Sequence, residues 1–115
     1  MELDLEYYKS ISKSYITRKE SFDCYHLYNE EINKNLSENI ATDENVLYLL
    51  YNDGYKLEVI KNLIFPNEVL EKLFIVEKDN DIKKEIAKEL KRRKSNPIIK
   101  KQILIYKKLV KNNGI

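Results

Sequence analysis

The sequence predicts an all-α protein, a short α-solenoid (superhelix) of about three paired-helix repeats with a capping helix at each end. The first observation is an internal repeat, because residues 32–40 align with residues 55–63 at an offset of 23 residues. The second is the spacing of apolar residues at i, i+1 and i+4, which is typical of one helical face. The third is composition, since two glycines and two prolines in 115 residues are too few for the turns of a β-sandwich.

Each repeat is predicted to be one pair of short helices. Val46, Leu47 and Leu50 share a helical face in one copy, and the same three places are apolar 23 residues later. A further copy at residues 82–90 follows residues 55–63 at an offset of 27. A helix pair of this length can bury its apolar face only against the next pair, so the repeats should share one core. The residues predicted to be buried are Leu50, Val69, Leu73, Ile86 and Leu90.

We expect residues 1–115 to form a single helical-repeat domain, with an N-terminal cap helix in residues 1–19 and repeats in residues 20–94. Apolar side chains at helical spacing predict the cap helix over residues 3–16. Thr17 and Glu20 have the spacing of a capping box, which predicts a second helix at residues 21–28.

The terminal helix is predicted in residues 95–115, where Asn96 and Pro97 form a suitable cap and first turn. Its apolar residues cover more than one side, whereas the end of a solenoid should present a polar face to water. We therefore expect this helix either to fold back into the core or to be covered by another chain, for example in a homodimer. The candidate interface residues are Ile99, Ile105 and Leu109.

The residues around the second repeat resemble a known family. Pro66 and Asn67 open the apolar stretch 68–73, and an acidic turn and residues 82–87 follow. This pattern is similar to the leucine-rich repeat variant, a short-period relative of the HEAT-like helical repeats, and the resemblance covers roughly residues 20–94. The resemblance implies a right-handed superhelix of paired short helices, used mostly as a binding scaffold. Some relatives hold an iron-sulfur centre with a cysteine cluster, but this chain has one cysteine, Cys24, so no cofactor is implied.

Residues with catalytic character are sparse. Cys24 and His26 lie two positions apart, so on a helix they point about 200° away from each other. Asp23 and Glu30 are better spaced to hold the His26 imidazole. One histidine and one cysteine are too few for a zinc site, and no phosphate-binding loop or nucleophile elbow is present. We expect no enzymatic activity, cofactor or metal, although a ligand or nucleophile role for Cys24 and His26 is the alternative to packing.

Charge is divided unevenly along the chain. Residues 1–54 hold 5 Lys/Arg against 11 Asp/Glu, and residues 55–115 hold 16 against 8. A solvated helix face is one interpretation of the basic half, and a site for phosphates or for an acidic partner is the other. The candidate basic partner-binding residues are Lys84, Lys88, Lys91, Arg92, Arg93 and Lys94.

Eight of the nine tyrosines lie in residues 1–55. Tyr28 and Tyr51 are equivalent in the repeat, and the simplest interpretation is that both pack against the core. Tyrosines that packing does not require would serve as partner contacts. The tyrosines considered as partner-binding residues are Tyr25, Tyr48 and Tyr51.

The predicted function is that of a small protein-interaction module without enzymatic activity. We include in this class an inhibitor or accessory factor from a bacterial or phage mobile element, of the anti-CRISPR or immunity type, that binds one partner surface. The alternative is a nucleic-acid-binding protein that uses the Lys/Arg-rich C-terminal half. No stretch resembles a signal peptide or reaches membrane-spanning length, so we expect a cytoplasmic protein without membrane contact.

Overall fold

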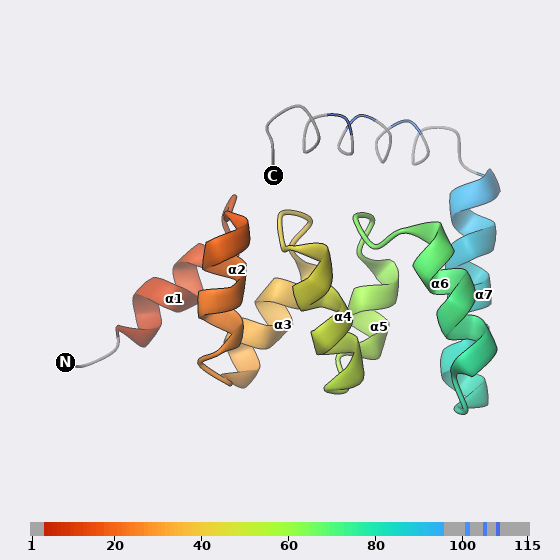
Figure 1. Cartoon of the computed structure of the whole chain (residues 1–115), viewed down its shortest axis with the longest axis horizontal. Coiled ribbons are helices and arrows are strands. Elements are labelled where there is room, and N and C mark those ends of the chain that lie inside the picture. Colours follow the sequence, from red (N-terminus) through yellow and green to blue (C-terminus); the bar gives the residue numbers. More distant parts are fainter. Residues whose placement is uncertain (1–3, 96–100, 102–104, 106–107, 109–115) are drawn as a thin grey trace. The chain divides into compact units, whose positions relative to one another are not determined.

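The computed structural model describes residues 4–95 together with Lys101, Ile105 and Lys108 (Figure 1). These residues form helices, turns and loops and contain no strand, so the prediction of an all-α protein is confirmed. Within the described residues, no helix is both long and apolar enough to cross a membrane. The helices are α1 (Leu5–Ile11), α2 (Arg18–Tyr25), α3 (Glu30–Glu38), α4 (Glu44–Asn52), α5 (Lys56–Lys61), α6 (Asn67–Val76) and α7 (Asn80–Ser95).

Contacts divide the chain into two compact units. Unit 1 is Met1–Asn62 and contains α1 to α5, and unit 2 is Leu63–Ile115 and contains α6 and α7. The single domain over residues 1–115 stays a prediction. Apart from Lys101, Ile105 and Lys108, the predicted terminal helix lies outside the described residues.

Local sequence sets where the first two helices begin and end. The predicted capping box is present, because the Thr17 hydroxyl accepts from the Glu20 amide (3.1 Å) and the Glu20 carboxylate accepts from the Thr17 amide (2.9 Å). Thr17 is itself the N-cap, so α2 begins three residues before the expected start. Helix α1 is shorter than the predicted 3–16, since it ends at Ile11 and the Ser12 hydroxyl donates to the Lys9 carbonyl (2.8 Å).

In unit 1, helices from α2 to α5 each pack on the next, and helices two places apart along the chain also contact each other. Helix α3 contacts both α1 and α5, and α2 contacts α4. The apolar face of α4 is fully buried at Val46, Leu47 and Leu50, as the repeat predicted. Ile32 and Leu36, which share one face of α3, are also fully buried.

Two asparagines connect successive helices of unit 1 through their carboxamides. Asn39 follows α3, and its Nδ2 donates to the carbonyls of Ser12 (2.9 Å) and Ser14 (2.7 Å). Asn62 follows α5, and its Nδ2 donates to the carbonyls of Ser37 (2.9 Å) and Asn39 (3.0 Å). The two asparagines are 23 residues apart, and so are their acceptors Ser14 and Ser37, which matches the offset of the sequence alignment. Their other acceptors, Ser12 and Asn39, do not keep that offset. Each carboxamide satisfies carbonyl groups that helix ends leave without an intrahelical donor.

In unit 2, α6 and α7 run side by side in opposite directions (Figure 1). Asp79 caps the N-terminus of α7, because its Oδ1 accepts from the Asp81 amide (2.8 Å). Leu73 of α6 and Ile86 of α7 are buried, as predicted. Val69 and Leu90 are only half-buried, contrary to expectation, and Leu90 lines an open groove.

Candidate functional site

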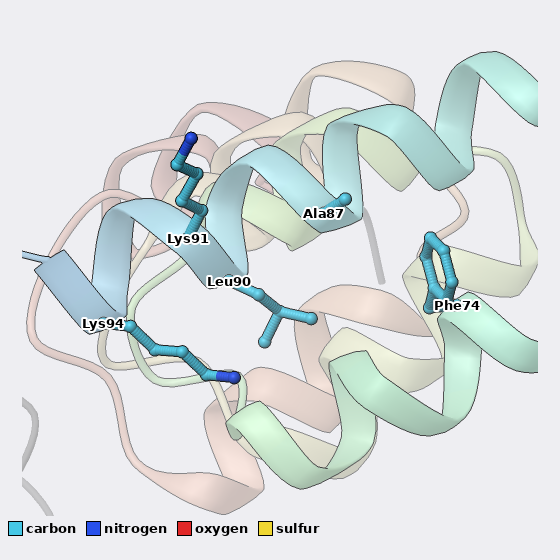
Figure 2. Close-up of a pocket in the computed structure, with 5 residues that line it drawn as sticks. All are labelled: Phe74, Ala87, Leu90, Lys91 and Lys94. Carbon is cyan, nitrogen blue, oxygen red and sulfur yellow. The ribbon is translucent and has the colours of Figure 1, made fainter.

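Unit 2 carries an apolar groove of about 510 Å³ between α6 and α7 (Figure 2). Phe74, in the last turn of α6, contributes a side chain that is 38% exposed. Of the described residues, Ala87 and Leu90 of α7 add to the apolar lining, and Lys91 and Lys94 also line the groove. Figure 2 shows Lys94 extending in the same direction as Leu90, whereas Lys91 points to the other side of α7. The groove therefore combines an apolar floor with cationic margins.

The α7 face that borders this groove carries four lysines and no acidic residue. At 100° per residue, its members lie within about 60° of Ala87 around the helix axis. No Asp or Glu falls in this sector of α7, and the Lys83 amine lies 5.0 Å from the centroid of the Phe74 ring. The residues of this lysine face are Lys83, Lys84, Ala87, Leu90, Lys91 and Lys94.

The opposite side of α7 holds a buried charged pair. Arg93 is 1% exposed, and its guanidinium donates to Glu89 (3.3 Å), to the Phe65 carbonyl and to Asn67 Oδ1 (3.0 Å). Burial lowers the pKa of Arg93, and the adjacent Glu89 carboxylate acts in the opposite direction. Arg93 was expected on a partner surface, but it lies inside unit 2, because its guanidinium satisfies backbone and side-chain acceptors there.

Arg92 and Lys88 also pair with acids of α7. Arg92 makes three hydrogen bonds to the Glu89 carboxylate at 3.1, 2.8 and 2.7 Å, and its side chain is 49% exposed. Lys88 pairs with Glu85 at 3.5 Å. The sequence does contain a signal for this pair, because Glu89 and Arg93 are four residues apart, on the same stripe as buried Ile86.

The three tyrosines considered as partner contacts differ in exposure. Tyr51 is 3% exposed, with the Lys56 amine 5.1 Å from its ring centroid. Tyr25 is buried, and its hydroxyl donates to Asp53 Oδ2 at 2.7 Å, which raises the pKa of Tyr25 to about 12. Tyr48 is exposed, so of these three side chains it alone presents a large surface to a partner.

Tyr28 does not pack like its repeat equivalent Tyr51. Helix α2 has already ended at Tyr25, so Tyr28 lies in a turn with φ of 53° and a side chain that is 73% exposed. Its ring centroid lies 6.0 Å from that of Tyr25 and 6.4 Å from that of His26. A bulky residue in this left-handed region is strained, which sequence alignment with Tyr51 could not reveal.

The Cys24 and His26 side chains lie in different environments. Cys24 is fully buried, and burial raises the pKa of its thiol to about 11. His26 is exposed and lies beside aromatic rings, with no hydrogen bond to Asp23 or Glu30 in the part of the chain that the structure describes. Among these described residues, no three His, Cys, Asp or Glu side chains gather where they could hold a metal ion.

Two of the three residues expected at an oligomer interface, Ile99 and Leu109, lie outside the described residues. Ile105 is described and is 49% exposed. The interface through these residues stays a prediction.

No protein-family model matches this chain, and the searches of curated proteins and of solved structures found no match either.

Proposed function

We propose that this chain is a small non-enzymatic protein-interaction module, built as a short α-solenoid of paired-helix repeats. It acts as an inhibitor or accessory factor by binding one surface of a partner protein. The observation that supports this proposal is the α6–α7 groove, where Phe74, Ala87 and Leu90 form an apolar floor bordered by lysines. An apolar centre with a charged rim is the usual anatomy of a protein-binding surface.

Nucleic-acid binding is the second candidate, because the lysine face of α7 could neutralise phosphates. Phosphate binding would leave the apolar floor of the groove without a role. Arginine is the better bidentate phosphate ligand, and both arginines of this stretch, Arg92 and Arg93, hydrogen-bond Glu89. A protein partner uses both the floor and the rim, so we place it first.

The test is retention of partners on the immobilised full chain, with and without nuclease. Ala87→Gln places a longer neutral side chain in the groove at an exposed helical position, so the fold should tolerate it. Lys72→Gln is the matched control, because Lys72 is exposed on the side of α6 away from Phe74. We expect the wild type and Lys72→Gln to retain one partner protein, and Ala87→Gln to lose it. Nuclease treatment should not change this retention. Retention that disappears with nuclease, or that Ala87→Gln leaves unchanged, would contradict the proposal.

A further inference from the structure

We infer that the partner element seated in the α6–α7 groove is an acidic amphipathic helix. Its apolar side would lie on Phe74 and Leu90, and its acidic side would face the lysine face of α7. This inference rests on the proposed function, since it names the chemistry of the partner at the same groove.

The shape of the groove fits a third helix. Two antiparallel helices present a valley along their length, and a helix laid in such a valley packs with axes about 8–10 Å apart. The lysine face extends from Lys83 to Lys94, which is about 17 Å at 1.5 Å per residue. A partner helix of about three turns covers this length and offers apolar anchors at i, i+3 or i+4, and i+7. An extended peptide would instead need a free strand edge, and the described residues contain no strand.

The charge of the groove selects an acidic ligand on one side only. Lys91 and Lys94 line the groove, and the Lys83 amine lies 5.0 Å from the centroid of the Phe74 ring. Lys84 shares their face of α7 by helical spacing, and no carboxylate of α7 falls on that face. On the α6 side, Glu71 is exposed one turn before Phe74, so that edge is not basic. The partner helix should therefore carry its acidic residues along the flank that faces α7. Complementary charge of this kind sets orientation and association rate more than affinity.

Neither the sequence that follows α7 nor the groove of a second copy matches this groove in charge. Residues 96–115 are apolar enough to dock, but they contain five lysines and no Asp or Glu. Their charge has the same sign as that of the lysine face, so the two repel each other. The same groove on a second copy carries the same lysines and would be repelled in the same way. An oppositely charged helix of another protein satisfies both the floor and the rim.

The experiment measures the fluorescence anisotropy of labelled synthetic peptides of about four helical turns mixed with the full chain. The first peptide has a leucine stripe flanked by glutamates on one side. The second replaces the glutamates with lysines, and the third scrambles the first so that composition is kept and the stripe is lost. A short single-stranded RNA is titrated in parallel.

The protein variants are Lys94→Glu and its matched control Lys72→Glu, which reverses one charge on the opposite side of α6 from Phe74. We expect the acidic amphipathic peptide to bind the wild type and Lys72→Glu equally well. It should bind Lys94→Glu about three- to tenfold more weakly, as expected for loss and reversal of one rim charge. The basic and scrambled peptides should bind at least about tenfold more weakly than the acidic stripe.

Equal binding of the scrambled peptide, absence of binding, or an unchanged affinity in Lys94→Glu would overturn the inference. Tighter binding of the RNA than of any peptide would also overturn it, and would place nucleic acid first. The retention experiment with Ala87→Gln separates the two proposals. If that variant loses a partner protein while the acidic peptide fails to bind, the groove binds protein and only the helix assignment is wrong.

Discussion

Two positions that align in the sequence, Asn62 in unit 1 and Glu89 in unit 2, differ in their chemistry. In unit 1, Asn62 uses a neutral carboxamide to bond backbone carbonyls, as Asn39 does one repeat earlier. At the equivalent place in unit 2, 27 residues after Asn62, stands Glu89, which has no donor and instead holds the buried guanidinium of Arg93. Arg93 then donates to the Phe65 carbonyl. A neutral amide that bonds directly has thus been replaced by an acid that requires a buried cation.

The two units also differ in net charge, and the unit with the buried Arg93 is the basic one. Residues 1–62 contain 7 Lys/Arg and 12 Asp/Glu, a net charge of −5, and residues 63–115 contain 14 and 7, a net charge of +7. Loss of a neutral amide that bonds buried carbonyls costs about 1–3 kcal/mol, whereas removal of one member of a buried ion pair costs about 3–5 kcal/mol. The basic unit is therefore the one whose fold should be more sensitive to a single substitution.

The largest effect should come from Arg93→Ala, which leaves Glu89 buried with Arg92 as its remaining cation in the Arg92–Glu89–Arg93 cluster. We expect the free energy of unfolding to fall by about 3–5 kcal/mol, as is usual when one member of a buried pair is removed. Urea denaturation followed by circular dichroism measures this change. Arg92→Ala is the control and should cost about 1 kcal/mol or less, because its side chain is half exposed. Equal losses in the two variants would show that the buried pair has no special role.

Asn62→Ala tests the neutral counterpart in unit 1. Removing the carboxamide leaves the Ser37 carbonyl without that donor, whereas the Asn39 carbonyl still accepts from the Thr42 amide (3.1 Å). The loss should cost about 1–3 kcal/mol. Asn39→Ala should cost less, since Asn39 is half-buried and water can replace it. The same denaturation series ranks both against Arg93→Ala. A larger loss for Asn62→Ala than for Arg93→Ala would reverse the comparison of the two units.

The Tyr25–Asp53 hydrogen bond in unit 1 should make stability depend on pH in the alkaline range. The folded pKa of Tyr25 is raised from its ordinary value of 10.0 to about 12, so the phenol is protonated in both states below pH 10 and its contribution is complete there. This contribution is lost as pH rises from about 10 to about 12. We expect the free energy of unfolding of the wild type to be about 1 kcal/mol larger than that of Tyr25→Phe at neutral pH. The difference between the two should vanish by about pH 12, and a constant difference across this range would contradict the assignment.

The smallest effect is expected at the turn after α2, and it is a gain. Tyr28→Gly removes a bulky side chain from a backbone with φ of 53°, which should stabilise the fold by up to about 1 kcal/mol. The turn after α4 already has a glycine, Gly54, at φ of 112°. Tyr15→Gly is the control, because Tyr15 is equally exposed without a positive φ, and it should give no gain. A lower melting temperature for Tyr28→Gly would mean that its ring contacts outweigh the backbone strain.

Apolar periodicity and capping chemistry predicted the parts of the fold that local rules decide. The burial of Leu50, Leu73 and Ile86 follows from helical spacing, and the Thr17–Glu20 capping box follows from two residue types at a fixed distance. These features depend on near neighbours in the chain, so one sequence is enough to identify them.

The candidate site depended on information that spacing does not carry. A run of basic residues does not show that Arg93 is buried, because that depends on acceptors such as the Phe65 carbonyl, 28 residues earlier. The exposure of Tyr28 follows from where α2 ends, and alignment with Tyr51 gave the opposite expectation. The apolar floor at Phe74 and Leu90 arises from two helices brought together, and neither stretch marks it alone.

The single cysteine of this chain can serve as a reporter of local opening. Cys24 is inside α2, and its thiol, with its raised pKa, should react with an alkylating reagent only when that helix separates from its neighbours. Alkylation at increasing urea concentration therefore measures the opening of unit 1, while circular dichroism measures both units. Arg93→Ala perturbs unit 2, which contains no cysteine. If that variant also accelerates alkylation of Cys24, the two units unfold as one cooperative block, and unchanged alkylation means that each opens by itself.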